Sequence, residues 1–69
     1  MACVIWKQPG NPPQSVSKAL GIERWQLRKA IHKIKGVWNL SGTDRVTIYD
    51  DGSVTDENDV PLGNIHDEI

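Results

Sequence analysis

A short basic stretch holds the side chains best suited to chemistry on a phosphate group. Between positions 25 and 35 the sequence places an indole, an imidazole and a series of cations: Trp25, Arg28, Lys29, His32, Lys33 and Lys35. Lysine and arginine bind phosphate oxygens, an indole stacks on nucleobases, and histidine transfers protons near neutral pH. Nucleic acid is therefore the first class of partner that these residue types suggest.

A helix from about Glu23 to Lys35, closed by Gly36, is expected to position these side chains. At 100° per residue, one side of that helix is aliphatic, and the other side is polar. The aliphatic stripe consists of Leu27, Ala30, Ile31 and Ile34, and the opposite side consists of Trp25, Arg28, Lys29 and His32. A tryptophan opposite the core stripe is unexpected unless another element covers it, so the exposure of Trp25 becomes the decisive structural observation.

A shorter helix is predicted before this one. Asn11 is expected to cap it, Pro12 to take its first position, and Gln14 to serve as the capping-box partner. Val16, Ala19 and Leu20 supply its apolar face, and Gly21 ends it.

The second half of the chain has the alternation and turn signals of strands. Asp51-Gly52 is a hairpin signal, and Pro61 confines the last strand to an edge. We predict an α+β fold in one domain, residues 1–69, with a basic helical hairpin over 11–36 and an acidic three-stranded antiparallel β-meander over 44–65. Its strands are expected at 45–49, 53–55 and 60–65, and an extra short N-terminal strand at 4–6 is an open alternative.

Charge divides the chain into two unequal halves. Residues 1–35 carry seven lysines and arginines against one glutamate, a formal +6, while residues 36–69 carry one arginine against eight acidic residues, a formal −7. A basic half suits a phosphate backbone. The alternative is that the two halves attract each other and form an internal clasp, with no partner involved.

Several functional classes receive no support from the composition. Cys3 is the single cysteine, and with two histidines it forms no zinc pattern. The acidic turns lack the ligand spacing of an EF-hand. We therefore expect no metal and no cofactor. The sequence shows no signal peptide and no membrane span, so a cytoplasmic location without membrane contact is expected.

The segment from Ser17 to Ile31 resembles a helix-turn-helix DNA-binding unit, with Ala19 as the small residue between helices and Gly21 at the turn. In that family the start of the second helix enters the major groove. The resemblance implies that residues at this helix start face base edges, where arginine and glutamine read guanine and adenine. These residues are Glu23, Arg24, Gln26 and Arg28.

A second resemblance runs from Leu27 to Glu68. It consists of the helix segment Ala30-Ile31-His32-Lys33-Ile34-Lys35-Gly36, the segments 42–48 and 50–54, and the final run Pro61-Leu62-Gly63-Asn64-Ile65-His66-Asp67-Glu68. Together these segments resemble the C-terminal part of bacterial polymorphic toxins of the contact-dependent inhibition type. That resemblance implies a small RNA-cleaving domain, or a relative that keeps the fold without catalysis, and an immunity protein as partner.

RNA cleavage without a metal needs a base, an acid and cations beside the phosphorane. With the resemblance as guide, the candidate catalytic residues are His32, Lys35 and His66, and the candidate nucleic-acid-binding residues are Arg24, Trp25, Gln26, Arg28, Lys29 and Lys33. Three interpretations remain open, with RNA favoured over DNA as the nucleic-acid partner. The domain is a metal-independent ribonuclease or a degenerate relative of one, a helix-turn-helix or winged-helix-like DNA-binding module, or a non-catalytic protein-interaction domain that uses Trp25.

Overall fold

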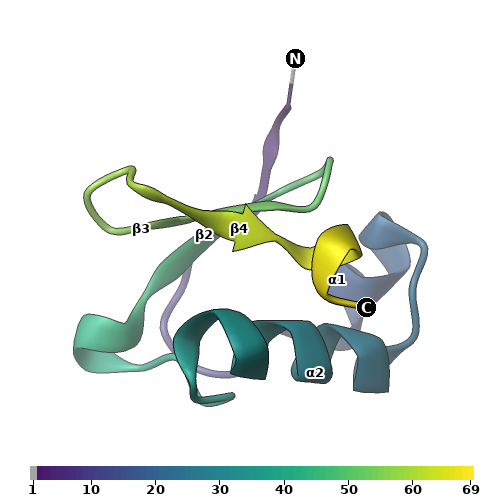
Figure 1. Ribbon diagram of the computed structural model, residues 1–69, viewed down its shortest axis with the longest axis horizontal. Helices are drawn as coiled ribbons and strands as arrows, with labels where there is room; N and C mark the ends of the chain where they lie inside the picture. The colour runs from purple at the N-terminus through teal and green to yellow at the C-terminus, as the bar shows by residue number, and fades with distance from the viewer. Residues whose placement is uncertain (1) are drawn as a thin grey trace.

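The protein folds into two layers, with helices on one face of an antiparallel sheet (Figure 1). The structure is a computed structural model that describes residues 2–69, apart from the side chain of Thr43. In chain order the elements are β1 (Val4–Trp6), α1 (Gln14–Leu20), α2 (Arg24–Lys35), the 3-10 helix η1 (Gly42–Asp44), β2 (Val46–Tyr49), β3 (Ser53–Asp56), β4 (Pro61–Asn64) and the 3-10 helix η2 (Ile65–Glu68). The predicted α+β class is confirmed.

The sheet has four strands in the order β1-β2-β3-β4, each antiparallel to its neighbour. The predicted three-stranded meander is therefore present, and the N-terminal strand joins it at one edge through the pairing of Trp6 with Ile48. Asp51-Gly52 makes the turn between β2 and β3, where Gly52 has a φ of 92°. Glycine suits this position because other residues rarely adopt positive φ.

Helix α2 begins and ends nearly where the sequence predicts. Glu23 forms a capping box with Gln26, which satisfies main-chain amides in the first turn, and Gly36 closes the helix in the left-handed conformation. Its inner side buries Leu27, Ala30 and Ile31.

Helix α1 begins later than predicted, and the expected cap at Asn11 is wrong. The helix starts at Gln14, its N-cap is Pro13, and no side chain caps it. The reason is the proline pair, because a residue that precedes proline is disfavoured in helical geometry, which keeps Pro12 out of the helix.

Ala19 does not serve as the small residue between the helices, because its side chain is exposed. The small buried residue of α1 is Ser17, whose Oγ donates a hydrogen bond of 2.7 Å to the carbonyl of Gln14. At 100° per residue, Val16, Leu20 and Ser17 share the side of α1 that faces the core. Ala19 lies outside this side, about 60° from Val16 in the direction away from Ser17.

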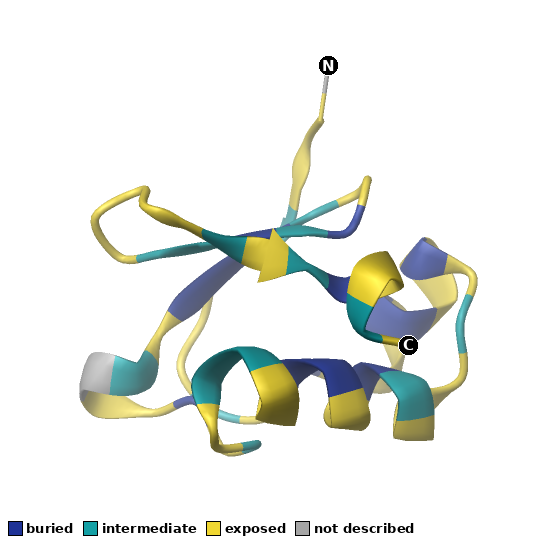
Figure 2. Cartoon of the chain, in the orientation of Figure 1, coloured by how far each residue is buried: buried dark blue, intermediate teal, exposed yellow. Residues whose placement is uncertain are grey.

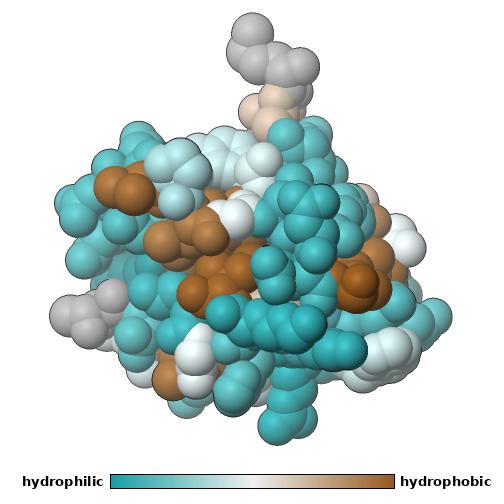
Figure 3. All heavy atoms as spheres, in the orientation of Figure 1, coloured by the Kyte–Doolittle hydropathy of each residue, from teal (hydrophilic) through white to brown (hydrophobic). Residues whose placement is uncertain are grey.

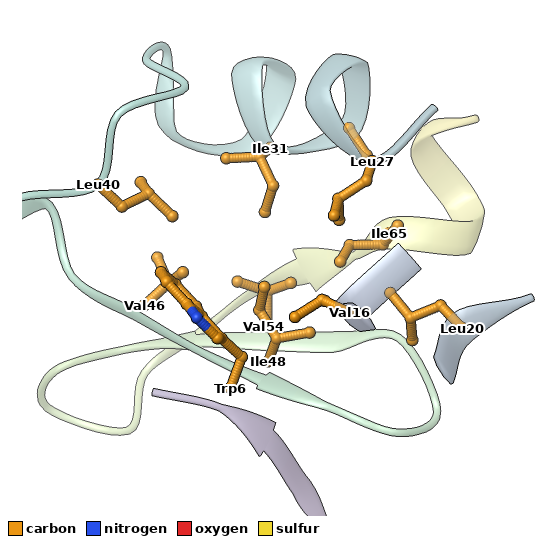
Figure 4. Packing of buried hydrophobic residues seen from close by; sticks show 11 residues of the cluster. Trp6, Val16, Leu20, Leu27, Ile31, Leu40, Val46, Ile48, Val54 and Ile65 are labelled. Atoms are coloured by element: carbon orange, nitrogen blue, oxygen red, sulfur yellow. The ribbon is translucent and has the colours of Figure 1, made fainter. Parts of the chain in front are cut away.

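The core fills the space between α2 and the sheet (Figure 4). Leu27 and Ile31 point from α2 toward Ile48 and Val54 of the sheet, and Ile65 of η2 closes one side. The whole buried apolar cluster is Trp6, Val16, Leu20, Leu27, Ala30, Ile31, Leu40, Val46, Ile48, Val54 and Ile65. Burying one such aliphatic side chain contributes roughly 1.5–3 kcal/mol, so this packing fixes which side of α2 faces outward.

Candidate nucleic-acid interface

The outer side of α2 carries a continuous group of exposed residues, here called the basic face: Trp25, Arg28, Lys29, His32 and Lys33. These five residues line a shallow hollow of about 420 Å³. Figure 2 shows α2 buried on the side toward the sheet and exposed on the side away from it. In the space-filling view the surface of the helical layer is predominantly hydrophilic (Figure 3).

Helical periodicity explains why these residues meet. Arg28, Lys29 and His32 follow Trp25 by three, four and seven positions, and such neighbours lie along one side of a helix. Because Leu27, Ala30 and Ile31 anchor the opposite side in the core, the basic face is held toward solvent by the fold itself.

The indole of Trp25 is 63% exposed, although tryptophan is a residue that usually buries most of its surface. The other two tryptophans are used internally, since Trp6 belongs to the core and Trp38 is half-buried against it. The indole of Trp25 is therefore accessible to a partner molecule. Its exposure agrees with the predicted position of Trp25 on the polar side of the helix.

Three acidic residues of the strand turns accept hydrogen bonds from main-chain amides within the protein. Asp50 accepts a hydrogen bond from the amide of Cys3, Asp51 accepts one from the amide of Ser53, and Asp56 accepts two in its own turn, from Asn58 and Val60. The hydrogen bonds from Ser53 lower the pKa of Asp51 below its usual range. These turns belong to the sheet layer, whereas the basic face lies on the far side of α2 (Figures 1 and 2). This arrangement does not favour an internal clasp.

Two of the residues expected to read base edges make contacts within the protein. The guanidinium of Arg24 donates a hydrogen bond of 2.9 Å to the carbonyl of Pro12 and lies 5.4 Å from the ring centroid of Trp38, a cation–π arrangement. The side-chain carbonyl of Gln26 accepts a 2.9 Å hydrogen bond from the amide of Glu23. No local pattern predicts the Arg24–Trp38 pair, because it depends on how the loop after α2 folds back.

His66 lies in a separate place from His32. Its Nε2 is 3.1 Å from the carbonyl of Leu20 at the end of α1, and its amide donates to Asn64 Oδ1 over 2.9 Å. A carbonyl only accepts, so Nε2 carries the proton in this contact. His66 thus ties η2 to α1, and the residues that line the hollow do not include it.

Lys35, the third candidate catalytic residue, is half-buried near the end of α2 and is not a lining residue of the hollow. Within residues 2–69, no cluster of three or more His, Cys, Asp or Glu side chains is arranged to hold a metal ion. None of the helices that the structure describes is long and apolar enough to cross a membrane.

Comparison of this chain with protein-family models, with curated proteins and with solved structures finds no match.

Proposed function

We propose that this domain binds nucleic acid through the basic face of α2. The observation that carries the proposal is an indole, 63% exposed, beside a hollow whose other lining residues are Arg28, Lys29, Lys33 and His32. Cations neutralise phosphates and release condensed counterions, and an accessible aromatic ring stacks on bases of any sequence.

The contacts of Arg24 and Gln26 favour binding through backbone and stacking over base readout at the helix start. Both side chains already have partners within the protein. Arg28, Lys29 and Lys33 extend from the exposed face and have long side chains that can follow a phosphate backbone. Binding of this kind is strongly dependent on salt and weakly dependent on sequence.

The proposal is tested with a variant in which Arg28, Lys29 and Lys33 are all changed to glutamine. Binding of a labelled 12-nucleotide RNA, as single strand and as duplex, is measured by fluorescence anisotropy across a salt series. Each phosphate contact removed lowers the magnitude of the slope of log K against log salt by about 1. Because the variant loses three cations, we expect its affinity at low salt to fall at least ten-fold and its salt dependence to become weaker.

A matched control changes Lys7, Lys18 and Arg45 to glutamine, which removes the same charge from exposed positions outside the hollow. This control is expected to bind within about two-fold of the unchanged protein, since the effect depends on position more than on net charge. Equal losses in the two triple variants would show that net charge and not the basic face governs binding, and would contradict the proposal. Absence of binding of either RNA form at low salt would also contradict it, and would favour a protein partner for Trp25.

RNA cleavage is the second candidate function, and the presence of His32 in the hollow among cations favours it. In this candidate reaction His32 would accept the proton of a 2′-hydroxyl while its oxygen bonds to the adjacent phosphorus, with Arg28 or Lys29 contacting that phosphate. The bond from phosphorus to the 5′-oxygen would break to leave a 2′,3′-cyclic phosphate, and water would protonate the departing 5′-oxygen. We expect any cleavage of RNA in the presence of a chelator to fall at least 100-fold in His32→Ala, since general-base catalysis contributes on the order of 100-fold or more. His66→Gln, a change outside the hollow, should keep cleavage while the protein remains folded.

The readout is the length of end-labelled RNA on a denaturing gel, with folding checked by circular dichroism. Intact RNA after prolonged incubation with the unchanged protein would remove the enzymatic candidate and leave the binding proposal standing.

A further inference from the structure

We infer that the basic face is built for unpaired nucleotides, with one base stacked on Trp25 and the adjoining phosphates on the cations beside it. This inference rests on the proposed function and narrows its ligand from nucleic acid in general to single strands and loops.

The shape of the basic face suits an unstacked base better than a duplex groove. A helix that enters the major groove of a duplex contacts base edges with side chains that project from its start. Here Arg24 and Gln26, at the start of α2, are held by Pro12, Trp38 and Glu23. The accessible features are a hollow and an indole at its side, and these suit a flat ring that has left its stack.

The composition of the hollow matches that of a single nucleotide. Lysine and arginine line such surfaces with their aliphatic stems and keep the charged groups in water. The stems of Arg28, Lys29 and Lys33 are therefore expected to line the hollow and to hold their cations at its rim. A nucleotide has the complementary arrangement, since its base is apolar on its faces and its phosphate is anionic. Bases in a duplex cannot present a face in this way, because they are stacked on each other.

The spacing of the residues on the basic face suits an extended strand. Trp25, Lys29 and Lys33 follow one another at intervals of four residues, and Arg28 and His32 form a second row beside them. The two rows extend along α2 for about two turns, or roughly 12 Å, which is long enough to contact more than one nucleotide of an extended strand.

The experiment compares single strands with duplexes of the same sequence, as RNA and as DNA, at one fixed salt concentration. We expect the single strands to bind at least five-fold more tightly than the duplexes. Trp25→Ala should weaken single-strand binding roughly ten-fold, since base stacking on an aromatic ring is lost, and should change duplex binding less than two-fold. Trp25→Phe should recover most of the single-strand affinity. A preference for RNA or for DNA strands identifies which source of unpaired nucleotides is bound.

The outcomes separate this inference from the proposed function. Duplexes that bind as tightly as single strands, or an equal effect of Trp25→Ala on both, would overturn the inference and leave nucleic-acid binding intact. Absence of binding to all four probes would overturn both. Because Trp25 is exposed, its substitution is expected to leave the fold unchanged, which thermal unfolding of the variant verifies.

Discussion

Truncation of Leu27 to alanine is expected to lower the free energy of unfolding by about 2–5 kcal/mol, the usual cost of emptying a buried leucine site. Leu27 is fully buried and belongs to the cluster that joins α2 to α1, η2 and the sheet. A chain of 69 residues is expected to have a total of roughly 3–10 kcal/mol, so the loss is a large part of the whole. Urea denaturation followed by circular dichroism measures it.

Val60→Ala is the matched control, because Val60 is an aliphatic residue that is 51% exposed. Its substitution should change the free energy of unfolding by less than about 0.5 kcal/mol, as is usual at the surface. If Leu27→Ala were as mild as Val60→Ala, the assigned inner side of α2 would be wrong. The outward orientation of the basic face would then lose its foundation.

Substitution of Gly52 by alanine is expected to be nearly as damaging, at roughly 2–4 kcal/mol, from positive-φ strain combined with overpacking. An added Cβ would lie 2.7 Å from Asn64 Oδ1 and 2.7 Å from His66 Nδ1. Both side chains are held in place by hydrogen bonds, so neither can move without loss of the contacts that tie η2 to α1 and to the turn.

Gly21→Ala separates the two contributions. Gly21 also has positive φ, at 72°, but an added Cβ there meets no atom within 4 Å. We therefore expect Gly21→Ala to lose only about 1–2 kcal/mol, the conformational cost alone. Urea denaturation of both variants gives the comparison, and equal losses would show that the contacts of Asn64 and His66 do not restrict Gly52.

Much of the fold follows from patterns within single elements. The stripe of Leu27, Ala30 and Ile31 predicts both the helix and its orientation, and the structure confirms it. Asp51-Gly52 likewise marks the first hairpin correctly. Local periodicity is enough in these cases because one element and its nearest turn contain all the information.

The features that the sequence did not predict depend on contacts between distant segments. The contact of Arg24 with Trp38 and Pro12, and the contact of His66 with Leu20, join residues that no local pattern relates. The start of α1 differs from the prediction because the restriction that Pro13 puts on the backbone of Pro12 outweighs the capping signals at Asn11 and Gln14. For the candidate site, periodicity placed Trp25, Arg28, Lys29 and His32 together, but it could not show that Arg24 and Gln26 have internal partners.

Both edge strands of the sheet, β1 and β4, are short and irregular, which disfavours self-association through the sheet edges. β1 has three residues and a register shift, while β4 contains Pro61, which has no amide hydrogen, and has a bulge opposite Val54 and Thr55. Long, regular edge strands pair with strands of other chains and promote amyloid-like aggregation, whereas short or proline-containing edge strands are poor templates for such pairing. We therefore expect little edge-to-edge polymerisation of this protein at high concentration.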